Sequence, residues 1–110
     1  MTKDSKIYIS SKMSGLPDYG VNNFDSEEAH LRSIGYINIS NPSCIGKKYG
    51  YNRSYSFYLK EAIKMLLECN TIYLFGNWED SRGAQLERSI AKALNMEIVE
   101  APIKEHIGEF

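Results

Sequence analysis

Apolar residues occur along the chain in two patterns: short runs that predict strands, and a spacing of three and four residues that predicts helices. Short runs rich in β-branched and aromatic residues, bounded by turn-forming residues, are typical of strands. Such runs lie at Lys6–Ser10, Tyr36–Ile39, Thr71–Phe75 and Met96–Glu100. Apolar residues three and four positions apart predict helices over Asn23–Ile34, Ser54–Glu68 and Ser81–Leu94. The stretch Cys44–Arg53 is rich in glycine and tyrosine, and we expect it to be irregular.

The order of these elements predicts the fold class. Strands that alternate with helices form parallel sheets joined by right-handed crossovers, with helices on both faces. We therefore expect an α/β fold with a small doubly wound sheet of the flavodoxin or Rossmann-like type, in one domain over residues 1–110. The expected strand order is 2-1-3-4, and the tail after Pro102 could add a fifth strand, contact a partner or be disordered. In such a sheet, ligands bind beyond the carboxyl ends of the first and third strands. Here those ends lead into "SSKMSG" and "GNWEDSRG".

One glutamate interrupts the apolar face of the helix predicted over Ser81–Leu94. At about 100° per residue, Glu87 lies on the same face as small and apolar residues. Those residues are Gly83, Ala84, Ile90, Ala91 and Leu94. Because an unpaired buried carboxylate is costly, three explanations stay open. The carboxylate could reach solvent or a basic partner such as Lys12, it could line a cleft as a catalytic or ligand-orienting group, or the helical register could be wrong.

The two loops offer further candidates for ligand contacts. Ser81 is a natural N-cap, and Gly83 leaves the first helical turn open, so that these residues with Arg82 could hold a phosphate or simply cap the helix. The hydroxyls of Ser10, Ser11 and Ser14 could contact a phosphate or sugar, although an ordinary loop would look the same. Trp78 could stack on a base or cover the edge of the core. For the aromatic cluster Tyr49, Tyr51, Tyr55, Phe57 and Tyr58, helix packing or a subunit interface is favoured over base stacking.

Composition excludes several classes of function. The chain is 43% hydrophobic and 25% charged with a net charge of −1, so it lacks the basic surface of a protein that binds duplex nucleic acid. No apolar run is long enough to span a membrane, and the start has no signal-peptide core, so we expect no membrane association and a cytoplasmic location. Cys44 and Cys69 have no disulfide or metal spacing, and His30 and His106 have no ligand spacing. We expect no metal and no cofactor.

Several motifs of the chain resemble a known family. "IYISSKMSGLPDY", "NPS", "LLECNTIYLFGNWEDSRGAQLE" and the following "AKAL" are similar to a family of small uncharacterised domains common in bacteria and their phages. That family is similar in turn to nucleoside 2-deoxyribosyltransferases and 2′-deoxynucleoside 5′-monophosphate N-glycosidases, which share the doubly wound fold. The resemblance covers nearly the whole chain.

The resemblance implies a role for individual residues. The G-x-x-x-E pattern of those enzymes matches Gly83–Glu87, which implies that Glu87 is the nucleophile that attacks the anomeric carbon of the sugar. It also implies that Ser81 and Gly83 bind a 5′-phosphate. Further contacts to the substrate are implied for Tyr8, Ser10, Ser11, Ser14 and Gly15 after the first strand, for Asn41 of the "NPS" motif, and for Trp78 over the base. A homodimer is also implied, with the stretch Tyr49–Tyr58 as a candidate interface.

Three positions depart from the family pattern. Ser11 replaces a glycine, which places a side chain where the backbone would approach the ligand. Ala62 replaces an aspartate that belongs to the active-site carboxylates of the transferases. Asn70 replaces an aspartate before the third strand, and we interpret that position as structural. The leading hypothesis is therefore cleavage or transfer at the N-glycosidic bond of a deoxyribonucleoside or its 5′-monophosphate. The alternative is a catalytically impaired module that senses or sequesters a nucleotide or a nucleotide-derived signal.

Overall fold

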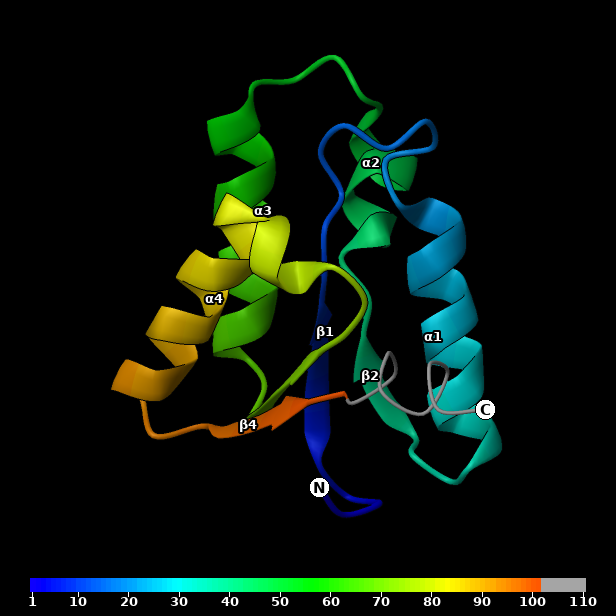
Figure 1. Cartoon of the computed structure of the whole chain (residues 1–110), viewed down its shortest axis with the longest axis vertical. Helices are drawn as coiled ribbons and strands as arrows, with labels where there is room; N and C mark the ends of the chain where they lie inside the picture. The colour runs from blue at the N-terminus through cyan, green and yellow to red at the C-terminus, as the bar shows by residue number, and fades with distance from the viewer. Residues whose placement is uncertain (102–110) are drawn as a thin grey trace.

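A four-stranded parallel sheet forms the centre of the computed structural model, which describes residues 1–101 (Figure 1). Its strands are β1 (Lys6–Ser10), β2 (Asn38–Ser40), β3 (Thr71–Leu74) and β4 (Glu97–Glu100). They lie in the order β2-β1-β3-β4, and every neighbouring pair is parallel. The predicted α/β class and strand order are confirmed. The tail after Pro102, for which a fifth strand was one of three alternatives, lies outside the described residues.

The helices cover both faces of the sheet, as predicted. They are α1 (Val21–Ser33), α2 (Ser43–Tyr49), α3 (Tyr55–Leu67) and α4 (Arg82–Ala93), with a short 3-10 turn, η1 (Trp78–Asp80), before α4. Helix α1 packs on the face that carries Ile7 and Ile9, while α3 and α4 pack together on the face that carries Tyr8 and Ile72. Figure 1 shows α1 on one side of β1 and the pair α3 and α4 on the other. Alternate residues of one strand therefore enter different cores.

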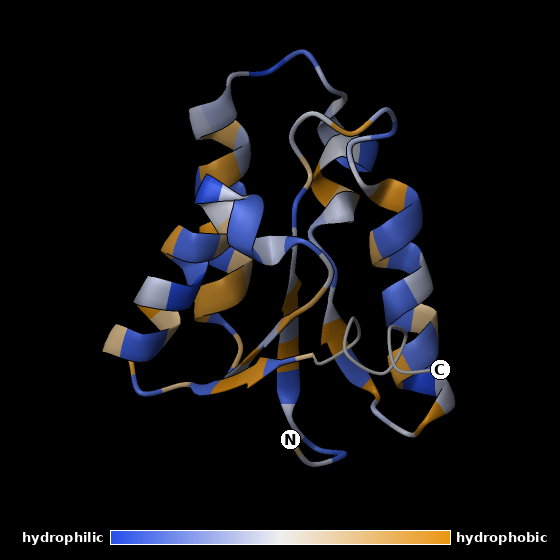
Figure 2. Ribbon diagram, viewed as in Figure 1, coloured by the Kyte–Doolittle hydropathy of each residue, from blue (hydrophilic) through white to orange (hydrophobic). Residues whose placement is uncertain are grey.

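Hydropathy follows this arrangement. In Figure 2 the hydrophobic colour runs along the strands, and the long helices carry both colours, as expected of amphipathic helices between a sheet and water. Strand β3 is buried along its whole length, as its unbroken apolar sequence predicted. Among residues 1–101, no helix combines the length and the apolar character that crossing a membrane requires.

Two elements differ from the prediction. Residues 43–49 form α2 instead of irregular chain, because the Asn41 side chain accepts a hydrogen bond from the Ser43 amide (2.9 Å) and starts a helical turn. Strand β2 begins at Asn38 instead of Tyr36, because the Tyr36 amide still donates to the carbonyl of Leu31 at the end of α1. Ile37, which the prediction placed inside a strand, is 62% exposed.

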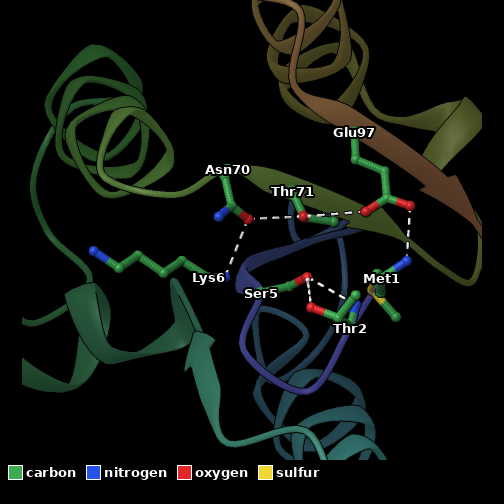
Figure 3. A network of polar contacts seen from close by, with 7 residues as sticks. All are labelled: Met1, Thr2, Ser5, Lys6, Asn70, Thr71 and Glu97. Atoms are coloured by element: carbon green, nitrogen blue, oxygen red, sulfur yellow. Dashed lines mark hydrogen bonds and ion pairs between the residues drawn. The ribbon is translucent and has the colours of Figure 1, made fainter.

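A polar network joins the amino ends of three strands (Figure 3). The Asn70 side-chain oxygen accepts hydrogen bonds from the Lys6 amide (3.1 Å) and from the Thr71 hydroxyl (2.9 Å). Glu97 at the start of β4 accepts from the Thr71 hydroxyl and from the amino group of Met1. Asn70 therefore links β1 to β3 at the amino ends of the strands, opposite the ligand loops, in agreement with its interpretation as structural.

Candidate active site

Glu87 is buried and held by two hydroxyl groups of β1. Its side chain is 6% exposed, and one carboxylate oxygen accepts a hydrogen bond from the Tyr8 hydroxyl (2.6 Å). The other oxygen accepts from the Ser10 hydroxyl (2.8 Å). Bonds of this length to an ionised acceptor are strong and directional. The carboxylate is thus fixed in orientation, while each oxygen keeps a further lone pair for another contact.

The sequence positions this triad through two periodicities. Tyr8 and Ser10 are two residues apart on β1, so both side chains leave the same face of the sheet. That face packs against α4, on which Glu87 shares the inward side with Ala84 and Ala91. The helical register predicted from the sequence is therefore correct. Lys12, which we considered as a partner of Glu87, forms no ion pair with it among residues 1–101, and the two Glu87 oxygens accept from Tyr8 and Ser10 instead.

Burial and hydrogen bonding act in opposite directions on Glu87. Burial raises the pKa of its carboxyl group above the ordinary value, and the hydrogen bonds from Tyr8 and Ser10 lower it. The pKa of Tyr8 lies well above its usual value because of burial and the adjacent carboxylate, so Tyr8 stays protonated and donates. The arrangement supports a poorly solvated carboxylate held in a fixed orientation, which suits an enzymatic nucleophile.

A cavity of about 650 Å³ opens beside this carboxylate. It lies at the carboxyl ends of β1 and β3, between the loop that follows β1, the starts of α1 and α4, helix α2 and the first half of α3. This is the switch point of the strand order, where the sequence predicted a ligand. The volume falls within the range of pockets that hold small organic ligands and cofactors.

One part of the cavity is suited to an anion. Ser81 caps α4 and accepts a hydrogen bond from the Ala84 amide (3.1 Å), so the first turn of the helix faces the cavity. Gly83 also lines it and presents no side chain to an incoming group. Basic side chains of Lys12, Arg53 and Arg82 line the same cavity. Free amide groups at a helix start, together with cations, favour a phosphate.

Most of the predicted contact residues meet in this cavity. Tyr8, Ser10, Ser11, Ser14, Gly15, Ser81, Gly83 and Glu87 all line it. The hydroxyl of Ser11 donates to the carbonyl of Phe75 (2.7 Å), which ties the end of β1 to the end of β3. The side chain that replaces the usual glycine is therefore engaged with the sheet.

Two predicted residues do not reach the cavity. Trp78 lies in η1, packs against the core under α4, and has the guanidinium of Arg88 5.8 Å from its ring centre. Of the two roles considered for Trp78, the structure shows the second, in which the ring covers the edge of the core. Asn41 donates to the carboxylates of Asp25 and Glu28 and so joins α1 to the start of α2. The neighbouring Pro42 and Ser43 line the cavity in its place.

The site carries few acidic groups. Ala62 is buried on the cavity wall, at the position where the family resemblance implies an aspartate. Glu61 pairs with Lys64 (2.9 Å) and does not line the cavity. Among residues 1–101, the carboxylates that line the cavity are Glu87 and Asp80. No group of three potential metal ligands occurs within the same residues.

Sequence reasoning did not assign a ligand role to Tyr19, Tyr51 or Gly46, all of which line the cavity. The signal for Gly46 was present, because a glycine inside a helix costs stability and calls for a packing or functional reason. Tyr51 belonged to the aromatic cluster for which helix packing or an interface was favoured over base stacking, and its contact with Tyr19 depends on the fold because the two lie in separate loops.

The fold and the site define a Rossmann-like α/β protein with a cavity at its topological switch point. Residues 5–100 match the family described as "Domain of unknown function (DUF4406)", and the chain belongs to this family. No curated protein shows significant sequence similarity to the chain.

Proposed function

We propose that this protein binds a 2′-deoxynucleoside 5′-monophosphate, or the corresponding nucleoside, and cleaves its N-glycosidic bond with Glu87 as the nucleophile. The observation that carries the proposal is the buried Glu87 carboxylate, oriented by Tyr8 and Ser10 beside a cavity of about 650 Å³. The resemblance of the motifs to deoxyribosyltransferases and monophosphate N-glycosidases supports the same chemistry.

The proposed reaction has two displacement steps. An oxygen of Glu87 forms a bond to C1′ while the bond from C1′ to the base nitrogen breaks, and the electron pair leaves with the base, which takes up a proton. A water then attacks C1′, which releases deoxyribose phosphate and regenerates the carboxylate; a second base in place of water would give transfer. Both transition states carry positive charge at C1′ and resemble those of retaining glycosidases. The absence of a 2′-hydroxyl makes this charge easier to develop.

The charges of the cavity favour a phosphorylated substrate over a nucleoside. Three basic side chains, Lys12, Arg53 and Arg82, line the cavity together with two acidic ones, Asp80 and Glu87. A dianionic phosphate at the start of α4 would complement the basic groups and the helix dipole. Ser81 and Gly83 would hold the phosphate through backbone amides and the hydroxyl.

A second candidate function is a binding module without turnover. The specific observation that favours it is Ala62, which leaves an apolar wall where the related enzymes carry a carboxylate. Such a protein would hold a nucleotide through the same contacts, and Glu87 would orient the ligand instead of attacking it.

One panel experiment separates these functions. The purified protein is incubated with the common deoxyribonucleosides and their 5′-monophosphates, free base is measured by chromatography, and thermal unfolding is measured in parallel. Release of base from a monophosphate supports the glycosidase. A rise in the unfolding temperature with a nucleotide and no released base supports the binding module, because a ligand that binds only the folded state stabilises it. A folded protein that gives neither result contradicts both.

Dimer formation is part of the same proposal. The exposed tyrosines Tyr51 and Tyr55, at the edge of the cavity, lie in the stretch expected to form the interface. Sedimentation equilibrium at micromolar concentration is expected to give twice the mass of the chain, and a monomer would contradict it.

A further inference from the structure

Two tyrosines from separate loops stack face to face at the cavity. Tyr19 lies between β1 and α1, and Tyr51 lies between α2 and α3. Their ring centres are 4.4 Å apart with an angle of 8° between the ring planes, and both residues line the cavity. Each remains partly open to solvent, with Tyr19 48% and Tyr51 40% exposed. Within residues 1–101 neither hydroxyl takes part in a side-chain hydrogen bond, so these rings are positioned by packing.

Tyr51 rests on a support built for a flat ring. A Cβ atom placed on Gly46 of α2 would lie 2.2 Å from the Tyr51 ring, which is far inside contact distance. The ring therefore lies directly against the helix backbone, and a side chain at position 46 would require the ring to move. A glycine in the middle of a helix lowers helix stability relative to alanine. In this structure, Gly46 allows one face of the Tyr51 ring to pack against the helix.

Tyr19 has an unusual backbone conformation. Its backbone φ is +57°, a left-handed conformation that bulky side chains rarely adopt. The contact of its ring with Tyr51 is an offset-stacked pair of the kind that any planar aromatic group could replace. The two tyrosines thus differ: one ring is set on a helix, and the other covers it from a loop.

Of the other aromatic residues that line the cavity, Tyr55 is 51% exposed, and the rest are engaged elsewhere. The Tyr8 hydroxyl donates to Glu87, and the Tyr58 hydroxyl donates to the Gly50 carbonyl and accepts from the Arg53 amide. Phe24 packs edge-on against Phe75 in the core under α1. Trp78 lies outside the cavity. Among residues 1–101, the exposed rings at the cavity are those of Tyr19, Tyr51 and Tyr55, and Tyr19 and Tyr51 are the two that form a stacked pair.

From this geometry we infer that Tyr51 is the stacking platform for a planar heteroaromatic base, and that the base displaces Tyr19 and takes its place on the ring. The inference rests on the proposed function for the class of ligand, since a nucleotide places a base at one end and a phosphate at the other. It adds the subsite that the sequence had assigned to Trp78. Gly46 is a positioning residue, because it acts on the base only through Tyr51.

Calorimetric titration tests the platform. The probes are the four common deoxynucleoside 5′-monophosphates and 2-deoxyribose 5-phosphate, which lacks a base, with Glu87→Gln protein to prevent turnover. Tyr51→Ala is expected to weaken the tightest nucleotide roughly tenfold or more and to change the sugar phosphate less than twofold. Tyr51→Phe, which keeps the ring, is expected to retain the affinity. Tyr19→Ala is expected to tighten the nucleotide, because it removes the competing ring.

Gly46→Ala provides the matched control for the route of action. It is expected to weaken the nucleotide as much as Tyr51→Ala does, and to have no further effect when Tyr51 is already alanine. Thermal unfolding of each variant verifies that it is folded. The inference is overturned if no nucleotide binds, if Tyr51→Ala weakens both kinds of probe equally or neither, or if Tyr19→Ala weakens binding as Tyr51→Ala does.

The result also separates this inference from the proposed reaction. If nucleotide binding depends on Tyr51 but the wild-type protein releases no base, the platform is supported and the cleavage reaction is contradicted. If the protein releases base but its affinity for the nucleotide does not depend on Tyr51, the cleavage reaction is supported and the platform is contradicted.

Discussion

At the scale of single residues, Glu87 shows how a carboxylate can occupy a position that helical periodicity assigns to the core. Two hydroxyl donors from the adjacent strand replace part of the lost hydration, and no basic residue is required. An acidic group stabilised this way remains more costly to ionise than one in water, which is the reason that its pKa is raised. This leads to a prediction for stability.

Glu87→Gln is expected to stabilise the protein relative to wild type at neutral pH more than at pH 4.5. The folded state of the wild type holds the Glu87 proton to a higher pH than the unfolded state, whose pKa is near the ordinary value of 4.5. Stability contributed by the protonated group is therefore full below that value and is lost as the pH rises through the raised folded pKa. Urea unfolding of both proteins at several pH values measures the difference. A difference that does not change with pH would contradict the assignment of the shift to Glu87.

Ala62→Asp is expected to change both stability and turnover. A carboxylate at this buried position of the cavity that Glu87 also lines is expected to cost about 1–3 kcal/mol of unfolding free energy at neutral pH. If the missing aspartate limits the reaction, the same variant releases base faster than wild type. Chemical unfolding and chromatography check the two effects, and an unchanged or lower rate in a folded variant would show that Ala62 is not the limiting difference.

Among the site residues, those fixed by periodicity were predictable and those fixed by tertiary contacts were not. Glu87 and its inward orientation followed from helical spacing, and the shared face of Tyr8 and Ser10 follows from strand alternation. The position of Trp78 did not, because a loop residue after a strand can turn either toward the ligand or under the next helix. Asn41 likewise proved to join α1 to α2, a contact that spacing along the chain does not reveal.

At the scale of elements, the first turn of α4 links helix stability to ligand binding. Ser81 caps α4, and Ser54 caps α3 through a hydrogen bond from the Phe57 amide of the same length, 3.1 Å. Ser54 does not line the cavity. The two serines therefore form a matched pair that separates capping from recognition.

Ser81→Ala and Ser54→Ala are each expected to lower the free energy of unfolding by about 1 kcal/mol, since each removes one N-cap. Ser81→Ala alone is expected to weaken a deoxynucleoside 5′-monophosphate, while the nucleoside without phosphate changes little. Denaturant titration and calorimetry give the two quantities. Equal changes in affinity for the two variants would mean that Ser81 has no role beyond its cap.

The elements themselves were predictable where the pattern was long. The three long helices have a clear helical period and β3 is an unbroken apolar run, whereas α2 is short and contains Gly46, so its sequence indicated a loop. At its start the Asn41 side chain accepts a hydrogen bond from the Ser43 amide, and at its middle the Tyr51 ring lies against Gly46. Helical periodicity reveals neither contact. The early start predicted for β2 counted Tyr36 as strand, although its amide completes the end of α1.

At the scale of the whole molecule, the strand order decides where the chemistry can occur. The order β2-β1-β3-β4 places the carboxyl ends of β1 and β3 at the switch point, and helices that start and end there leave a cavity. At the amino ends of the strands, the hydrogen bonds of Asn70 and Glu97 link β1, β3 and β4. The order was predictable because right-handed crossovers leave few alternatives, and it located the loops after β1 and β3. The part of the cavity wall formed by α2 and Tyr51 could be assigned only from the structure.

The measurement that tests this account most directly is the rate of free-base release from deoxynucleoside 5′-monophosphates by wild type, Glu87→Gln and Glu61→Gln. Glu61→Gln is the matched control, because it makes the same substitution on a side chain that does not line the cavity. We predict that the wild type releases base, that Glu87→Gln lowers the rate roughly a thousandfold or more, and that Glu61→Gln keeps it. Release that continues undiminished in Glu87→Gln, or no release from any monophosphate by the folded wild type, would contradict the role of Glu87 as nucleophile.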